Sequence, residues 1–558
     1  MMLKAQWRRR AETPYSPTDQ FTTRVVCAYL YLDPLVCDAV WNAYLADPQR
    51  AWGISPTLDL TALLRHARIA RRTLVLRDTA LLAVLLSAPS TLVVEAALRY
   101  GRPGVLLACA GLVAAWLALR KAGWVAVKLG QRVRAGFTRN RRWMFRIAFL
   151  AALTAFLIGY QVAESDVVVF PLAVLLGSVV PAWAISLADQ YQSIRCANRC
   201  WRGVEPPTAT APVLAAAIEE RLCQVPTKNV VFYHEERAPL PFVGSGHRIA
   251  HWNITVDMGK GASDDDNDEG PLTPAPFTVG DLYTFLDEDW SLDNAVGIRH
   301  GFRLYLNGGK VDSDPALRPN LSGSPRDRLA PETIAHRVDT KDNEDSQRVF
   351  FLESVTRQDD LVVTASTRAA HRGRLLFFEV SLNALLPPHP AIVQSVRLLP
   401  VHRRDVVREA LGGGTRRLPQ LVLDSPIRLT RRLLAATVLW RIRRGAVRAT
   451  RRFRYYDYGA FITAREGLSS ADFAHLDDNV RRALKRDTVY MASRLATGLR
   501  AFLDAHSIDT TDFDLPQSVV KNVQNWNVDK VQADVVGFGN SNTFVVKTSD
   551  DPPQSKKA

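Results

Sequence analysis

Four long apolar runs between residues 79 and 188 constrain the fold more than any other feature of this 558-residue sequence. Each run has 17 to 22 residues, and an α-helix of that length can cross a hydrocarbon layer of about 30 Å. A single charged residue, Glu95, occurs in them, close to the end of the first run. We therefore expect a membrane protein with four transmembrane α-helices, arranged as two hairpins, at residues 79–97, 103–119, 147–163 and 167–188.

The loops between the runs indicate how these helices are oriented. Residues 120–146 carry nine Lys and Arg residues and no acidic residue, whereas the two other loops are short. Because positively charged loops stay on the cytoplasmic side, the middle loop and both termini are expected in the cytoplasm. The N-terminal segment continues polar through Arg8, Arg9 and Arg10, and no signal-peptide core follows it. The prediction is a multi-pass protein of the cell (inner) membrane.

The chain after the last run predicts a large cytoplasmic α+β region. Short runs of apolar and β-branched residues, such as 230–233, 302–306 and 361–365, alternate there with turn residues. The predicted domains are an N-terminal cytoplasmic helical region at 1–77, the transmembrane region at 78–190, a connecting helix at 191–225, an α+β domain at 226–420, a basic amphipathic and long helical region at 421–510, and a β-like segment with a disordered tail at 511–558.

Residues 428–454 form the most strongly basic segment. They include ten Arg residues and no acidic residue around the apolar run 433–440, and this segment is too short and too charged to span a bilayer. We predict a basic amphipathic helix on the anionic lipids of the inner leaflet. Nucleic acid is the rival partner, and a solvated helix packed on its own domain is the alternative without a partner. The arginines expected at the membrane surface are Arg431, Arg432, Arg441, Arg443, Arg444 and Arg448.

The net charge of +15 is distributed unevenly. Residues 1–190 hold 22 basic and 11 acidic residues, and residues 421–454 add ten Arg against Asp424, a net +9. The basic charge thus gathers around the predicted spans and in one helix, which disfavours nucleic acid as a partner.

Residues 470–506 carry an apolar stripe at nearly helical spacing, which predicts one long amphipathic helix or two in line. Core packing and self-association both explain such a stripe. A homo-oligomer therefore stands beside the lipid bilayer and an unidentified cytoplasmic protein among the expected partners.

No constellation of residues supports an enzyme claim. His247 and His251 lie four residues apart, but no Glu follows the first, and the neighbouring glycines favour a turn and a strand over a helix. The acidic run 264–269 lacks the glycine and the final glutamate of a calcium loop. Cys196 and Cys200 are read as reduced cytoplasmic thiols. We assign no catalytic, cofactor-binding or metal-ligating residue and expect no cofactor.

Three stretches of the sequence are distinctive. They are Arg-Val-Val-Cys-Ala-Tyr-Leu-Tyr-Leu-Asp at 24–33, Pro-Phe-Val-Gly-Ser-Gly at 241–246 with Trp252 and Asp257, and Tyr-Asp-Tyr-Gly-Ala at 456–460 with Arg465 and Glu466. Together they resemble a group of uncharacterised actinobacterial four-span integral membrane proteins. The resemblance covers most of the chain and implies a bacterial inner-membrane setting. It implies no activity and no catalytic residue.

Three functions remain open from the sequence. The first is a non-enzymatic membrane protein whose large cytoplasmic region binds a partner, as a sensor or effector in stress or defence. The second is a membrane-anchored enzyme with a site at residues 229–258, which requires polar groups to converge near Gly244, His247, His251 and Asp257. The third is a channel or transporter.

Overall fold

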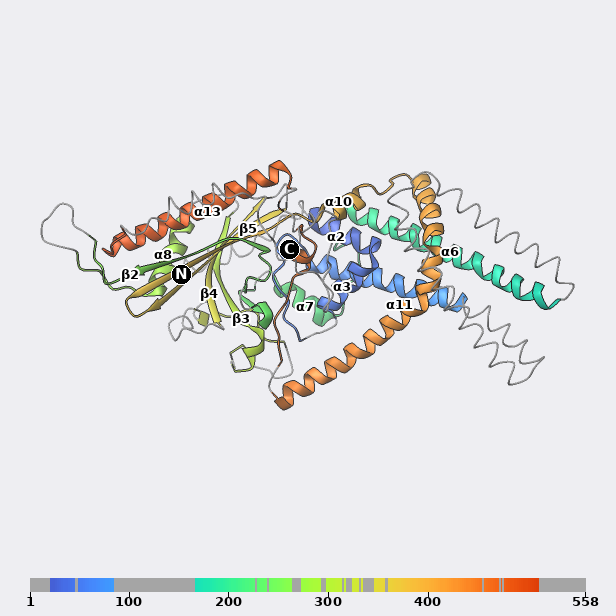
Figure 1. The fold of residues 1–558 in the computed structure, drawn as a ribbon, viewed down its shortest axis with the longest axis horizontal. Coiled ribbons are helices and arrows are strands. Elements are labelled where there is room, and N and C mark those ends of the chain that lie inside the picture. The colour runs from blue at the N-terminus through green and yellow to red at the C-terminus, as the bar shows by residue number, and fades with distance from the viewer. Residues whose placement is uncertain are drawn as a thin grey trace, which may run out of the picture. The chain divides into compact units, whose positions relative to one another are not determined.

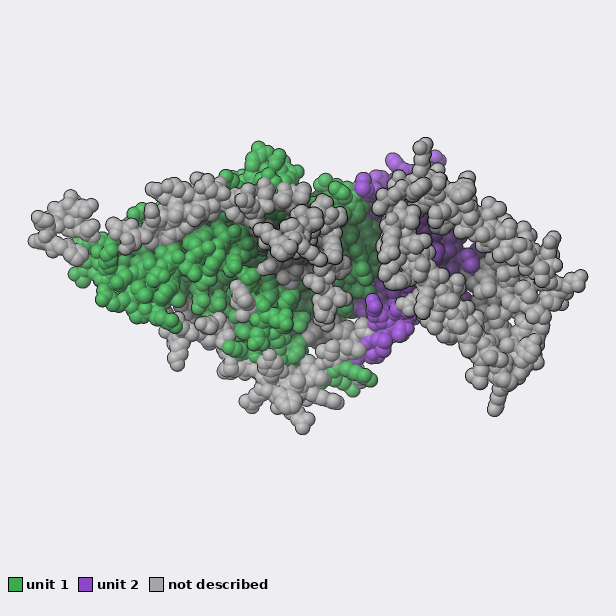
Figure 2. Space-filling model, in the orientation of Figure 1, with its two compact units in different colours: residues 1–68, 200–397, 441–558 green, residues 69–199, 398–440 purple. Residues whose placement is uncertain are grey.

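A computed structural model places the chain in two compact units. Unit 1 comprises residues 1–68, 200–397 and 441–558, and unit 2 comprises residues 69–199 and 398–440 (Figures 1 and 2). The structure describes residues 21–45, 49–84, 166–225, 228–237, 240–262, 272–292, 298–313, 316–317, 324–330, 333–334, 346–356, 360–453, 456–470, 473 and 476–510.

A six-stranded mixed sheet forms the centre of unit 1. The strand order is β1-β3-β4-β5-β6-β2. β1 and β3 pair in parallel, and every other neighbouring pair is antiparallel. Each expected apolar run lies within a strand, because alternating or continuous apolar residues suit a sheet with at least one covered face. The strands are β1 (Val230–Tyr233), β2 (His247–Asp257), β3 (Ile298–Asn307), β4 (Ser346–Thr356), β5 (Leu361–Arg372) and β6 (Leu375–Leu385).

Two helices cover the apolar face of this sheet, α8 (Val279–Leu292) and α13 (Asp478–Ala505) (Figure 1). Val363 and Leu382 on the central strands are fully buried in one core with Leu484 of α13. Full burial of such a side chain contributes about 1.5–3 kcal/mol. α13 is the long helix predicted within residues 470–506, and its apolar stripe packs into this core. Self-association stays a prediction.

The remaining helices of unit 1 are short. Asp33 separates α2 (Phe21–Leu32) from α3 (Pro34–Tyr44), and its carboxylate accepts hydrogen bonds from the first free amides of α3, Leu35 N and Val36 N. This capping, with Pro34 in the first turn, explains why a new helix begins there. The others are α7 (Ala216–Gln224), α10 (Pro390–Arg397), α12 (Ala464–Gly467) and the 3₁₀ turns η2 (Glu235–Arg237) and η3 (Gly308–Ser313).

Apart from residues 398–402, the described residues of unit 2 are helical. They belong to a helical stretch at 60–84, to α6 (Asp166–Arg202) and to α11 (Arg403–Phe453), all three of which continue into unit 1. Polar contacts join α6 to α11, because the Ser186 hydroxyl donates to the carbonyl of Gly414 over 2.9 Å.

A buried charge network lies between these helices. Asp78, which is fully buried, accepts hydrogen bonds from Arg77 and from Arg432 of α11. Arg77 also reaches Asp189 of α6 over 3.0 Å, and the Arg428 Nε atom lies 3.6 Å from Asp78. Two carboxylates, Asp78 and Asp189, and their arginine partners therefore tie together three helices that are distant in sequence.

The transmembrane fold predicted from the sequence is wrong. Among the helices in the described ranges, none has both the length and the apolar character required to cross a bilayer. This finding overturns the four-span class and the multi-pass inner-membrane localisation with both termini in the cytoplasm. The membrane setting implied by the resemblance is corrected with them.

The structure describes the four apolar runs to different extents. Runs 103–119 and 147–163 lie outside the described residues, as does 79–97 beyond residue 84. Run 167–188 falls in α6, whose side chains are described from residue 179 onward. That part of α6 carries four charged residues after position 188 and packs on α11. Run length does not separate a spanning helix from a long helix that packs against other helices, which explains the error.

Candidate functional site

The distinctive stretch at residues 456–460 lies at the edge of the sheet. Residues 457–461 run beside β1, where Ala460 N donates to Phe232 O and His234 N donates to Ala460 O. Tyr233 and Ala460 form an isolated parallel bridge there. The segment thus extends the sheet beyond β1, and its residues lie at the carboxyl ends of the parallel strands β1 and β3. Such edges often hold ligand sites in α/β proteins.

Asp457 organises the loops at this edge. Its carboxylate accepts from Gly459 N over 2.7 Å and from Glu235 N over 3.2 Å, and it lies 3.3 Å from the Nε2 atom of His234. The Nδ1 atom of His234 faces the amide of Glu236 at 3.3 Å. Because both ring nitrogens have partners, the imidazole positions the loop and is not arranged as a general base.

Glu466 binds the turn at residues 241–246. Its Oε1 atom accepts from Gly244 N over 2.8 Å and from Gly246 N over 3.2 Å, while Oε2 accepts from Thr463 N in a capping box. Gly244 has a φ of +95°, and a Cβ atom there would lie 2.2 Å from the carbonyl oxygen of Ile54. The glycines of this stretch are therefore explained by a tight turn held by a carboxylate.

Arg465, which precedes Glu466 in the sequence, is fully buried. Its guanidinium donates to Thr57 Oγ1 over 3.1 Å and to the carbonyl of Asp360 over 2.8 Å. Burial lowers the pKa of Arg465 to about 10, although Asp360 and Glu466 favour its charged form. These contacts clamp three segments together, which is a structural role.

The residues of the hypothetical enzyme site do not converge. His247 packs edge-on against Phe473, whereas His251 Nδ1 contacts the hydroxyl of Ser381 at 3.0 Å. Asp257 ends the same 11-residue strand, β2, near Arg374. A strand of that length places its two ends about 30 Å apart. No polar pocket therefore gathers these side chains.

The cysteines and acidic residues offer no metal centre within the residues that the structure covers. Cys200 is buried, with its Sγ atom 3.6 Å from Nδ1 of His66, and Cys196 is half-buried. Burial raises the pKa of the Cys196 thiol. The acidic run 264–269 lies outside the described residues.

The arginines predicted at a membrane surface all lie on α11 but differ in their surroundings. Arg432 is buried, with its Nη1 atom 2.6 Å from Asp78, so it is part of the interior of unit 2. Arg431, Arg441 and Arg444 are exposed. Arg443 and Arg448 belong to the helix, and their side chains are outside the description. For Arg432, packing on its own domain is the alternative that fits.

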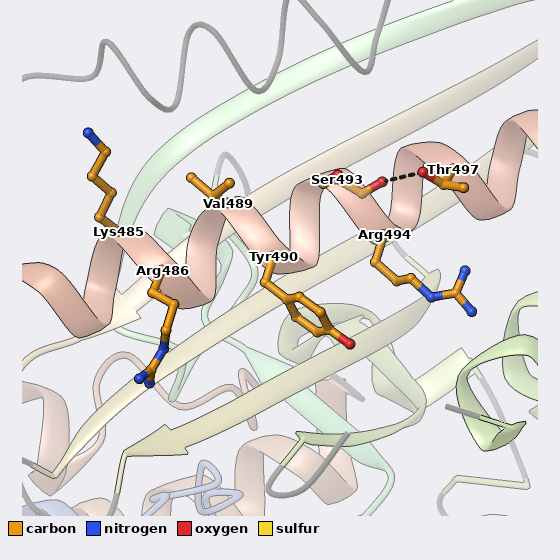
Figure 3. A pocket seen from close by; sticks show the side chains of 7 residues that line it. All are labelled: Lys485, Arg486, Val489, Tyr490, Ser493, Arg494 and Thr497. Carbon is orange, nitrogen blue, oxygen red and sulfur yellow. Dashed lines mark hydrogen bonds between the residues drawn. The ribbon is translucent and has the colours of Figure 1, made fainter. Parts of the chain in front are cut away.

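A shallow, open groove on the outer face of α13 is a candidate for binding. It has a volume of about 550 Å³ and lies over the middle of the helix (Figure 3). Tyr490 is 38% exposed. The lining side chains are Lys485, Arg486, Val489, Tyr490, Ser493, Arg494 and Thr497.

The described lining of the groove is basic, and Asp487 of the same helix pairs with one lining residue, Arg486, over 2.9 Å. Asp487 is buried and accepts from the hydroxyl of Ser354 in β4 over 2.8 Å. Helix α8 lies alongside, where Trp290 packs edge-on against Tyr490 and Asp289 pairs with Arg494 over 2.6 Å. The sequence analysis assigned only the apolar stripe of α13 and missed this face. Its signal was the repeat of Lys and Arg between positions 481 and 500.

Comparison with known proteins gives one match. No curated protein and no solved structure matches the chain. A family model described as the AbeC-like domain matches residues 251–541, which are 291 of the 558 residues. The match includes four strands, β3 to β6, in full, most of β2, both helices on the apolar face and the segment with Asp457 and Glu466. The chain therefore belongs to the AbeC-like domain family.

Proposed function

We propose that this protein is a binding protein, and that the groove on α13 holds an acidic segment of a protein partner. The observation that carries the proposal is the lining of the groove, in which Lys485, Arg486 and Arg494 lie with Tyr490 and no acidic residue is found among the lining residues that the structure describes. Cations and an aromatic ring around one groove complement carboxylates interspersed with apolar side chains.

The groove suits a protein segment better than a phosphate polymer. Val489 and Tyr490 provide apolar contact area, which an amphipathic peptide can cover. Acidic residues also stand close by, since Asp289 contacts Arg494 and Glu288 is exposed on the same helix. A uniformly charged nucleic-acid backbone would be repelled by these carboxylates, whereas a short peptide contacts only the basic lining.

A binding role also agrees with the other candidate residues. Asp457, Glu466 and Arg465 are occupied in holding loops and turns together. The polar residues of β2 are spread along the strand. Each of these groups has a structural task.

The proposal is tested with a fluorescein-labelled peptide of glutamates with interspersed leucines, titrated by anisotropy into the full chain at low salt. The double variant Lys485→Glu/Arg486→Glu should weaken binding by about tenfold or more, because two attractive contacts become repulsive. The control is Arg404→Glu/Arg408→Glu, which makes the same charge change at exposed positions of α11. This control should alter the affinity by less than about twofold.

Two results would contradict the proposal. Equal weakening of peptide binding in both double variants would indicate that the net charge of the protein, and not the groove, determines the affinity. A single-stranded oligonucleotide of matched charge that binds the groove more tightly than the peptide would assign the groove to nucleic acid.

A further inference from the structure

Arg494 pairs with a carboxylate of a neighbouring helix, whereas Arg486 of the same lining pairs with Asp487 of its own helix. The Asp289 Oδ1 atom of α8 lies 2.6 Å from Nη2 of Arg494. Both side chains are largely shielded, with 27% of Arg494 and 21% of Asp289 exposed. Lys485 and Arg486 lie in the same lining with far more open side chains, 71% for Arg486.

The second oxygen of Asp289 is poorly placed. Its Oδ2 atom is buried and has no hydrogen-bond partner. It lies against α13 where Gly498 leaves room, because a Cβ atom at that glycine would be 3.2 Å from it. A buried carboxylate oxygen without a donor is unfavourable, so the Asp289–Arg494 pair is weaker than a fully satisfied one.

We infer that Asp289 is an internal competitor of the ligand, and that a carboxylate of the bound segment displaces it from Arg494. This inference rests on the proposed function of the groove. Arg494 is held beside Trp290, with its guanidinium carbon 5.8 Å from the ring centroid, so the cation stays at the groove when its partner changes. A ligand carboxylate must then bind Arg494 more strongly than Asp289 does, so Asp289 lowers the affinity of the site without touching the ligand.

If Asp289 competes with the ligand, loss of its charge should tighten ligand binding. Loss of an ordinary structural ion pair would leave binding unchanged or weaken it. Asp289→Asn keeps the shape of the side chain and removes the competing charge. The labelled acidic peptide should bind the full-length variant about three to ten times more tightly than the wild type. In the background of Arg494→Gln, the same substitution should change the affinity by less than about twofold, because the contested cation is gone.

Glu288→Gln is the matched control. It removes one negative charge from the adjacent, exposed position of α8 and should leave the affinity within about twofold of the wild type. Thermal unfolding of each variant checks that α8 and α13 remain folded.

The outcomes separate this inference from the proposed function. Unchanged or weaker binding by Asp289→Asn, with binding by the wild type intact, overturns the competitor role and leaves the groove assignment standing. Equal tightening by Glu288→Gln also overturns it. If neither the wild type nor Asp289→Asn binds the peptide, both the groove assignment and the competitor role are overturned.

Discussion

Asp287 and Glu353 are buried carboxylates of unit 1 in opposite electrostatic surroundings. Burial, together with the neighbouring charge of Glu288, raises the pKa of Asp287 to about 6. Burial also disfavours ionisation of Glu353, but Arg299 and Arg303 outweigh it and bring the pKa of Glu353 to about 2. One carboxylate therefore opposes the fold at neutral pH, and the other supports it.

Asp287→Asn should stabilise the protein at pH 7 by about 1–3 kcal/mol. The native state holds a proton on Asp287 that the unfolded state releases near pH 4, so the free energy of unfolding of the wild type falls as the pH rises from about 4 to about 6. Asp287→Asn has no carboxyl group at this position, so its free energy of unfolding does not fall in this way. Urea unfolding at pH 4 and pH 7 measures the free energy of unfolding of both proteins. The stabilisation by Asp287→Asn should disappear at pH 4.

Glu353→Gln provides the comparison of opposite sign. It should destabilise the protein at pH 7, and the difference should shrink as the pH falls below about 4.5, where the unfolded carboxyl is protonated. A stabilising effect of Glu353→Gln at pH 7, or a gain from Asp287→Asn that is independent of pH, would show that these pKa values do not govern stability.

Among the elements, the three helices of unit 2 depend on Asp78. Asp78→Asn leaves Arg432 and Arg77 buried beside a neutral side chain, and loss of one partner from a buried ion pair costs about 3–5 kcal/mol. We expect a destabilisation of that size in urea unfolding followed by far-UV circular dichroism.

Asp424→Asn is the control for this network. Asp424 also pairs with an arginine of α11, Arg428, but its side chain is 49% exposed. Its loss should cost less than about 1 kcal/mol. Similar losses from Asp78→Asn and Asp424→Asn would mean that burial of the network does not determine its strength.

The same elements show what local sequence patterns can predict. The apolar stripe of residues 470–506 predicts α13, and the run 230–233 predicts β1, because both depend on periodicity and burial. The parallel pairing of β1 with β3 and the position of β2 beside β6 could not be predicted, since they depend on contacts between distant residues. Arg432 illustrates the limit: its partner, Asp78, is 354 residues away.

For the molecule as a whole, the assembly of unit 1 from segments that are distant in sequence explains why the candidate site could not be predicted. The groove requires α8 beside α13, and these helices are brought together only by the sheet that both cover. The basic segment of α11 is conspicuous in the sequence because residues 428–454 hold ten Arg and no acidic residue. The Lys and Arg residues of α13 are dispersed, and they form one surface only after the helix is built.

The two units should differ in stability because their interiors differ. The core of unit 1 is an apolar sheet face under two helices, whereas the described interior of unit 2 includes Asp78, Arg77 and Arg432, whose desolvation offsets much of their attraction. Hydrogen exchange measured by mass spectrometry at increasing urea should therefore lose protection in residues 403–440 before it does in β4, β5 and β6. Asp78→Asn should lower the urea concentration at which residues 403–440 lose protection. The urea concentration at which β4, β5 and β6 lose protection should not change. Simultaneous loss of protection in both regions would instead mean that the helices crossing the boundary couple the units into one cooperative structure.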